Sequence, residues 1–273
     1  NKRRKQRTQV NSILPLSIGE DYVFIRRDFF FLFFSKILFL ITLVFGRVFF
    51  RLVGSHTIIG RNKIRGLDHL GFVSIANHCH FLDGALTSSA LGPRTIWFAS
   101  VQRNFETPYL RRILRLLKGF PIPSSPFGLM QIMNSCIDAI TKGEVVNFNP
   151  EAELWHLHQG IGTFQKGAFY LAHEANCPVV PVVHLFKPKT LFGKKISNQI
   201  LDITSVIGDP IYPGNPRSLD KNEKRIESAK IMTDQAHDWT EKEMFESVKI
   251  MTDRAHDWME KEMFEYKMKN DLS

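Results

Sequence analysis

From residue 57 onwards, short apolar runs alternate with segments in which apolar residues recur every three or four positions. The runs are rich in Val, Ile and Phe, and this composition is typical of buried strands. Seven such runs lie at residues 57–60, 71–76, 95–99, 119–123, 144–148, 178–186 and 201–207. Helical periodicity predicts helices over residues 109–117, 127–140 and 163–174. The alternation predicts an α/β domain with a mainly parallel mixed sheet, helices on both faces, and a functional site at the carboxyl ends of the strands.

A long segment rich in Phe and Leu spans residues 29–53 and contains three cations, Lys36, Arg47 and Arg51. On a helix, Arg47 lies about 20° from Lys36 and Arg51 about 40° further, so the cations share one narrow stripe. This geometry favours a helix lying in the membrane interface, with its cations at the lipid headgroups. The alternative is a spanning helix whose cations face a partner helix. Under both interpretations the segment is a membrane anchor.

The net charge of +9 is concentrated at the N-terminus, because residues 1–66 carry thirteen Lys and Arg against three acids. Residues 1–11 form a basic arm, which suits either nucleic acid or an anionic bilayer. The Phe-rich segment that follows favours the bilayer, and we expect no nucleic-acid partner. The three cysteines show no paired spacing, which favours free thiols in a reducing compartment. We therefore expect a protein associated with the cytoplasmic face of a membrane.

The C-terminal part contains a tandem repeat of nineteen residues, in which residues 228–246 recur as 247–265 with few changes. Both copies have helical composition. Two copies are too few for a solenoid, so we interpret them as a duplication in which one copy packs and the other overhangs or faces a partner. Three regions follow: a basic arm and anchor at 1–56, an α/β domain at 57–217, and a helical extension at 218–273.

The predicted helix at residues 109–117 separates apolar from basic side chains. Leu110, Ile113, Leu114 and Leu117 lie on one side, and Arg111, Arg112 and Arg115 on the other. The first interpretation is a docked helix with a solvated basic face. The alternative is a cationic patch that binds phosphates of a donor or of lipid headgroups.

Candidate chemistry lies where the run at residues 72–76 ends, because Asn77 and His78 follow directly and Asp83 comes five positions after His78. Asp83 opens a predicted helix, about one turn away from His78. A carboxylate there can hold one imidazole nitrogen while the other acts as a general base on a substrate hydroxyl. The alternative is structural: His78 ends the strand and Asp83 caps the helix.

Four ordered blocks strengthen the chemical interpretation. They are Asn77-His78-x4-Asp83, Gly119-Phe-Pro-Ile, Phe148-Asn-Pro-Glu and Val179-Val-Pro-Val-Val183. Together they resemble the glycerolipid acyltransferase family, which includes the lysophosphatidic acid acyltransferases. The resemblance covers about residues 58–213.

The resemblance implies that His78 is the general base on the acceptor hydroxyl and Asp83 its orienting acid. The donor would be acyl-CoA or acyl-carrier protein, and the acceptor a lysophospholipid such as 1-acylglycerol-3-phosphate; no metal or other cofactor is implied. The resemblance also implies substrate-binding residues, namely Asn77, Gly119, Pro150, Glu151, Lys166 and Gly167. Glu151 would belong to the acceptor loop, and Lys166 and Gly167 to a helix start that suits a phosphate. The structural alternatives are a capping role for Glu151 and a solvated surface position for Lys166.

The chain departs from the family pattern at two blocks. The second block usually ends in Arg, where this chain continues with Pro and Ser, and the third usually reads Pro-Glu-Gly-Thr-Arg, where this chain has Pro150-Glu-Ala-Glu-Leu154. Both arginines expected to bind the acceptor phosphate are therefore absent. Glu153, His156 and His158 suit a different headgroup.

Two other functions are compatible with parts of the sequence. A metal-dependent hydrolase would use His78, His80, His156 and His158 as a cluster of ligands, although the spacing differs by one residue from the usual signature. A non-catalytic membrane-binding module would explain the apolar segment but not the four ordered blocks.

Overall fold

The computed structural model describes a large part of the 273-residue chain. The described residues are 16, 18–53, 55–80, 82–152, 154, 162–188, 190–191, 194–195, 201–214 and 223–243. The basic arm, Glu153, His156, His158 and the second repeat copy lie outside these residues.

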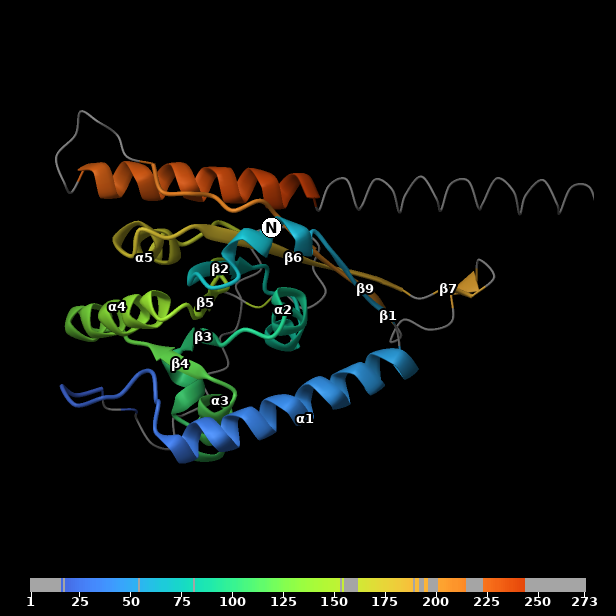
Figure 1. The fold of residues 1–273 in the computed structure, drawn as a ribbon, viewed down its shortest axis with the longest axis horizontal. Helices are drawn as coiled ribbons and strands as arrows, with labels where there is room; N and C mark the ends of the chain where they lie inside the picture. Colours follow the sequence, from blue (N-terminus) through green and yellow to red (C-terminus); the bar gives the residue numbers. More distant parts are fainter. Residues whose placement is uncertain are drawn as a thin grey trace, which may run out of the picture.

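A seven-stranded mixed sheet forms the centre of the molecule, with the strand order β1-β9-β6-β2-β5-β3-β4 (Figure 1). The strands are β1 (Ser55–Ile59), β2 (Phe72–Ala76), β3 (Ile96–Val101), β4 (Gly119–Ile122), β5 (Val145–Phe148), β6 (Val179–Pro188) and β9 (Leu201–Ile207). Strands β6, β2, β5, β3 and β4 run parallel to one another. Strand β9 runs antiparallel to β6, and β1 runs parallel to β9. All seven predicted strands are therefore present, and the prediction of a mainly parallel mixed sheet is confirmed. A short hairpin, β7 (Thr190–Leu191) with β8 (Lys194–Lys195), lies apart from this sheet.

Helices cover both faces of the sheet. The helices that follow β1 as far as β6 are α2 (Asp83–Leu91), α3 (Pro108–Leu116), α4 (Pro126–Thr141) and α5 (Gly167–Glu174), with short 3-10 turns η1 (Arg61–Leu67) and η2 (Gln102–Phe105). Residues of α4 and α5 pack on one face of the sheet in the largest hydrophobic cluster, whereas α2 and η1 pack on the other. Helix α5 starts four residues later than predicted, because Gln165 instead donates its backbone N–H to Pro150 O at 2.8 Å.

Strand β2 lies in the middle of this arrangement and is buried at all five positions. Val73 and Ile75 belong to the cluster under α4 and α5, whereas Phe72 and Ala76 belong to the cluster under α2. A strand buried on both faces reads as a continuous apolar run, as this one does. The residues that follow β2 therefore emerge from the most constrained part of the sheet.

The segment before α1 (Phe29–Val53) packs into the α/β domain. Phe24 is 2% exposed and Phe31 6% exposed, and both belong to the largest core cluster. Arg27 forms two hydrogen bonds of 2.7 Å with the carboxylate of Glu144, which also accepts from Trp97 Nε1 at 2.8 Å. The start of the predicted anchor is therefore continuous with the core of the domain.

Apart from Phe31, many apolar side chains in the first half of α1 are exposed. Phe29, Phe30, Phe33, Phe34, Leu40 and Ile41 are each more than half exposed. In the described part of the chain, no helix has both the length and the apolar composition that crossing a membrane requires.

Helix α3 does not dock as first predicted. Leu110 is 41% exposed and Ile113 51% exposed, whereas Leu114 and Leu117 are half-buried, so only part of the apolar side packs on the domain. Arg115, from the basic side, instead turns inward and donates hydrogen bonds to the backbone carbonyls of Phe24 and Val23. The prediction of a docked apolar side with a solvated basic face is therefore wrong at Leu110, Ile113 and Arg115, whereas Arg112 is exposed as predicted.

A helix over residues 223–243 packs across the upper side of the molecule, beside α5 and far from α1 (Figure 1). Ala229, Met232 and Ala236 are fully buried in the main core cluster. This spacing of three and four residues is that of a single buried helix face. The first repeat copy therefore packs on the domain as far as residue 243.

Candidate active site

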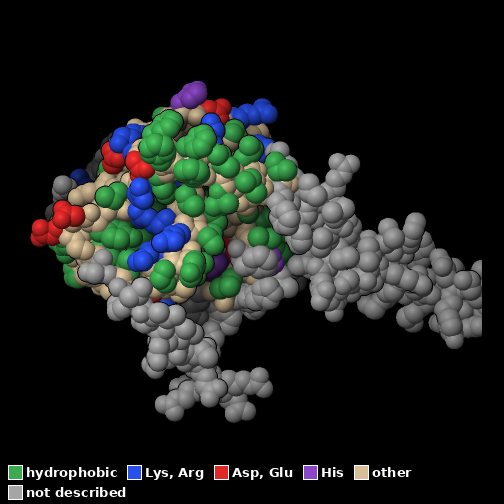
Figure 2. Space-filling model, turned by 90° about the horizontal axis from the view of Figure 1, so that it is seen from below, with side chains coloured by type: hydrophobic (Ala, Val, Ile, Leu, Met, Phe, Trp, Pro, Cys, Tyr) green, Lys and Arg blue, Asp and Glu red, His purple; other side chains and the backbone are tan. Residues whose placement is uncertain are grey.

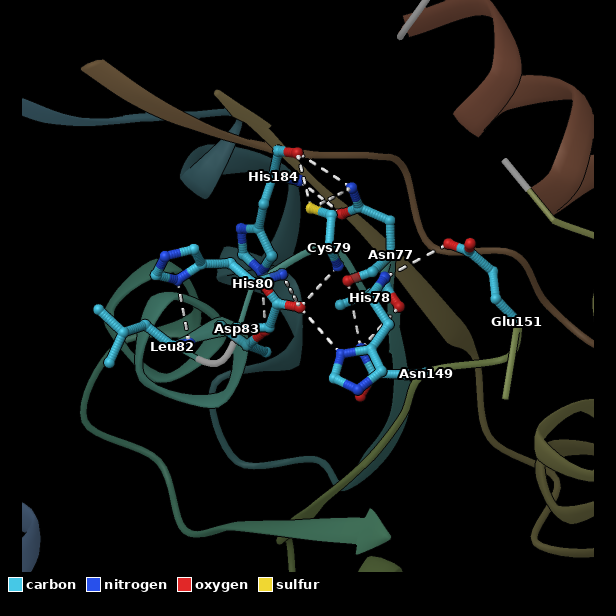
Figure 3. A network of polar contacts seen from close by, with 11 residues as sticks. Asn77, His78, Cys79, His80, Leu82, Asp83, Asn149, Glu151 and His184 are labelled. Atoms are coloured by element: carbon cyan, nitrogen blue, oxygen red, sulfur yellow. Dashed lines mark hydrogen bonds and ion pairs between the residues drawn. The ribbon is translucent and has the colours of Figure 1, made fainter. Parts of the chain in front are cut away.

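His78 and Asp83 meet at the carboxyl end of β2, as the sequence predicted (Figure 3). His78 lies two residues beyond β2, and Asp83 is the first residue of α2. The His78 Nδ1 atom is 2.9 Å from Asp83 Oδ2. One third of the His78 side chain is exposed, whereas only 3% of the Asp83 side chain is. An imidazole open to solvent is therefore held from behind by a buried carboxylate.

The same carboxylate oxygen also holds the loop between the two elements. Asp83 Oδ2 accepts hydrogen bonds from the backbone N–H groups of Cys79 at 2.9 Å and His80 at 3.0 Å. Three donors therefore converge on one oxygen atom. Hydrogen bonds to a charged carboxylate are among the stronger ones in proteins, so this arrangement defines the path of the loop.

Asn149 and Glu151, which follow β5 in the chain, fix the backbone around His78. Asn149 donates from Nδ2 to Ala76 O at 3.0 Å and to Asn77 O at 3.2 Å. Glu151 is 8% exposed and accepts from the backbone N–H groups of His78 and Gly162, each at 3.3 Å. Burial raises the pKa of the Glu151 carboxyl, and the two backbone hydrogen bonds partly counter this rise.

Asn77 joins the end of β2 to the neighbouring strand β6. Its Nδ2 donates to His184 O at 3.0 Å, and its Oδ1 accepts from His184 N at 2.7 Å. The side chain is therefore fully engaged within the protein. Both residues are buried, with exposed fractions of 3% and 0%.

The predicted acceptor loop and the predicted helix start lie together. Pro150 is buried beside Glu151, and its carbonyl accepts the backbone N–H of Gln165, the residue before Lys166. Lys166 and Gly167 are both exposed where α5 begins. The structure therefore places Pro150 and Glu151 next to His78, and Lys166 and Gly167 one and two residues after Gln165, which contacts this loop.

Gly119 lies elsewhere. The strand register places it level with Ser74, through Asn147 and Phe98, and three strands away. Three inter-strand spacings are about 14 Å. A Cβ atom at Gly119 would lie 2.8 Å from Leu114 O, so glycine allows β4 to pack closely against the end of α3. The structure does not bring Gly119 together with His78.

Ala152 occupies the position at which the family pattern has glycine. Its φ angle is 56°, in the left-handed region that favours glycine. Its N–H donates to Asn149 O at 3.1 Å, which closes the turn around Glu151. The departure from the family pattern therefore strains the backbone beside the candidate site.

Among the described residues, no three His, Cys, Asp or Glu side chains are placed together to hold a metal ion. The ring of His80 accepts a hydrogen bond from the backbone N–H of Leu82 at Nδ1 and lies 5.4 Å from the ring of Phe186. The other two histidines of the proposed cluster, His156 and His158, lie outside the described residues.

Two further residues at this site were not predicted, namely Asn149 and His184. Asn149 is a polar residue directly after a buried strand, which is the signal that singled out Asn77. His184 is a histidine inside the apolar run of β6, and a polar residue at such a position needs a partner. Both signals were present in the sequence.

A partly exposed histidine oriented by a buried acid, at the carboxyl edge of an α/β sheet, is an arrangement typical of enzymes that use a general base. Comparison with known proteins is consistent with this class. Residues 58–185 match the family model described as Acyltransferase. Over this part of the chain, the sequence is similar to the acyltransferases of that family.

Two relatives illustrate the similarity. The chain is 29% identical over 180 residues to the chloroplastic 1-acyl-sn-glycerol-3-phosphate acyltransferase BAT2 of Brassica napus. The aligned stretch covers 63% of this chain and 51% of that protein. The chain thus spans about half the length of this curated relative. It also shares its fold with the crystal structure of the 1-acyl-sn-glycerophosphate (LPA) acyltransferase PlsC from Thermotoga maritima. That match has a TM-score of 0.50 and 16% identity, and covers 75% of this chain and 80% of that one.

Proposed function

We propose that this protein is a membrane-associated acyltransferase of phospholipid biosynthesis or remodelling. It moves an acyl group from an acyl thioester of coenzyme A or acyl-carrier protein to a hydroxyl of a lysophospholipid such as 1-acylglycerol-3-phosphate. The observation that carries the proposal is the 2.9 Å contact between His78 Nδ1 and the buried Asp83. The activity for which the two relatives are named supports the acceptor class.

This geometry supports the following reaction. With Nδ1 bound to Asp83, the Nε2 atom of His78 takes the proton from the acceptor hydroxyl as its oxygen attacks the thioester carbonyl carbon. A C–O bond forms, the C–S bond then breaks, and the thiolate leaves and takes up a proton. The Asp83 carboxylate stabilises the imidazolium that exists between the two proton transfers. The acyl donor is a co-substrate, and the mechanism requires no cofactor.

The residues around Glu151 suit the acceptor side of the site. Pro150 and Glu151 form the loop next to His78, and the exposed Lys166 and Gly167 supply a cation and an accessible backbone close to that loop. Asn77 contributes by holding the strand end that carries His78.

We expect the missing arginines to affect which acceptor is used. A single lysine binds phosphate as a point charge, whereas arginine binds it through two parallel hydrogen bonds. Lys166 should therefore bind the acceptor phosphate more weakly than the two arginines of the family pattern would. Selectivity for lysophosphatidate over other lysolipids should be relaxed, while the acyl-transfer chemistry is unchanged.

The exposed apolar surface supports membrane association. Helices α1 and α3 pack against each other and present exposed Phe, Leu, Ile and Tyr side chains. Figure 2 shows the molecule from the side on which these helices lie, where hydrophobic side chains are interspersed with Lys and Arg. Apolar side chains beside cations suit the interface of an anionic leaflet. The three cysteines are free and buried, which is consistent with the cytoplasmic face.

The test is acyl transfer by purified His78→Ala and Asp83→Asn variants, with lysophosphatidate and a second lysolipid as competing acceptors. Each variant should lose between about 10²- and 10⁴-fold in kcat, because a positioned base contributes that much. Asparagine has nearly the shape of aspartate and keeps an oxygen for the backbone donors, but cannot stabilise an imidazolium by its charge. The control is His69→Ala, since His69 is exposed in a loop, and it should keep full activity.

Activity of His78→Ala close to that of the wild type would refute the proposal. Ester hydrolysis that needs no acyl donor and is abolished by a chelator would favour the metal-dependent hydrolase instead. Vesicle binding by a wild-type protein that transfers no acyl group would favour the non-catalytic module.

A further inference from the structure

The distance between His78 and Asp83 depends on how the end of β2 is held against α2, because His78 lies two residues after β2 and Asp83 is the first residue of α2. The second carboxylate oxygen, Asp83 Oδ1, is buried and has no hydrogen-bond partner within the described structure. Asp83 is therefore fixed through Oδ2 alone. A second connection between the two elements would keep the pair at a constant distance.

His184 on β6 is placed to make this connection. Its backbone N–H donates to Asn77 Oδ1 at 2.7 Å, and its backbone carbonyl accepts from Asn77 Nδ2 at 3.0 Å. Asn77 immediately precedes His78 in the chain. The main chain of His184 therefore holds the end of β2 that carries the base.

The ring of His184 holds α2. Its Nε2 atom is 2.9 Å from the hydroxyl of Thr87, which lies four residues after Asp83 in the same helix. Residues four positions apart lie on the same helix face. His184 thus contacts both elements of the dyad, through its backbone on one side and its ring on the other (Figure 3 shows its place beside Asn77 and Asp83).

The other ring nitrogen of His184 is also held. Its Nδ1 atom is 2.9 Å from Ser205 Oγ on β9, and Ser205 Oγ is 2.8 Å from His56 Nε2 on β1. Burial lowers the pKa of His184 to about 4, so its ring is neutral near pH 7. A neutral ring has one donor and one acceptor nitrogen, and the Ser and Thr hydroxyls can match either tautomer. The ring cannot rotate without breaking two buried hydrogen bonds.

We propose that His184 is a positioning residue for the acyl-transfer reaction, which sets the His78–Asp83 geometry by linking Asn77 to Thr87. The inference rests on the proposed function. It assigns no contact with substrate to His184. The hydrogen bond between the Thr87 hydroxyl and His184 Nε2 connects His184 to α2.

The test compares three substitutions in α2. Thr87→Val removes the hydroxyl and keeps the branched shape, so kcat should fall roughly 10- to 100-fold, as expected for a small misplacement of reacting groups. KM for donor and acceptor should stay within about twofold, because substrate binding is not altered. Thr87→Ser restores the hydroxyl and should recover most of kcat. Ser88→Ala is the matched control, because Ser88 is equally buried but bonds to Gly84 O within its own helix.

A purely structural role would give a different pattern. Thr87→Val would then have a lower melting temperature than the wild type but the same kcat as the control Ser88→Ala. That result would overturn the inference. If Thr87→Val does not fold, Ser205→Ala tests the same ring through Nδ1, with the same loss of kcat expected and an unchanged kcat overturning the inference. His78→Ala is assayed in parallel. An inactive His78→Ala beside a fully active Thr87→Val would refute this inference alone, whereas an active His78→Ala would refute the proposed function.

Discussion

Asp83 shows how one side chain can have a structural and a chemical role together. Its Oδ2 atom accepts backbone N–H groups of the Cys79–His80 loop, as a structural acid would, and also the ring nitrogen of His78. These donors fix the position of the oxygen atom that faces His78. The structural and catalytic interpretations of Asp83 are therefore compatible, because the acid that shapes the loop also orients the imidazole.

Ala152 offers a prediction about backbone strain. Ala152→Gly should raise the free energy of unfolding by about 0.5–1 kcal/mol, because a left-handed conformation costs alanine about 1–2 kcal/mol and the greater freedom of unfolded glycine offsets part of the gain. Urea unfolding of the variant and the wild type measures the difference. The control is Ala139→Gly in α4, where glycine should destabilise instead. Equal losses of stability in both variants would show that Ala152 is not strained.

At the scale of elements, the hydrophobic pattern predicted the strands and most helices. The strand that carries His78 was identifiable because β2 is buried on both faces, so its residues must all be apolar or small. The start of α2 was identifiable because Asp83 is an acid before a run of good helix formers. Such features depend on local sequence, and these local predictions are confirmed.

The orientation of α3 and the role of His184 could not be predicted in the same way. Arg115 turns inward because it finds the carbonyls of Val23 and Phe24, which are more than ninety residues away in the chain. The backbone of His184 meets Asn77 across 107 positions. Periodicity within one helix or strand contains no information about such distant partners. The dyad was predictable because its two members lie five residues apart.

The docking of the segment before α1 gives a second stability prediction. Glu144→Gln should lower the free energy of unfolding by about 1.5–3 kcal/mol, because it weakens the paired hydrogen bonds from Arg27 in a half-buried site. Asp138→Asn is the control, since Asp138 lies 3.6 Å from Arg27 and is half exposed, and it should cost no more than about 0.5 kcal/mol. Urea unfolding distinguishes the two variants. An equal effect of both would mean that the geometry of the pair contributes nothing.

For the molecule as a whole, the N-terminal region has two opposite surfaces. Phe24 and Phe31 are buried in the main core, whereas Phe30 and Phe33 on the same segment are 71% and 52% exposed. Deleting the region would remove core side chains together with the exposed ones. The predicted anchor is therefore best tested by changing exposed residues only.

The double substitution Phe30→Gln with Phe33→Gln should reduce binding to vesicles of phosphatidylcholine and phosphatidylglycerol by at least about 10-fold, because each buried Phe contributes roughly 1.5–3 kcal/mol. Its melting temperature should remain that of the wild type, since both side chains are exposed in the folded protein. The control is Ile226→Gln, an apolar residue 50% exposed, as Phe33 nearly is, on the helix at the opposite side of the molecule (Figure 1). Sedimentation with vesicles measures binding, and acyl transfer to a short-chain, soluble acceptor measures the site separately. If α1 contacts the lipid, only the double variant should fail to sediment with the vesicles. The double variant and Ile226→Gln should both keep their activity on the soluble acceptor. Wild-type sedimentation by the double variant would exclude this face of α1 as the membrane contact.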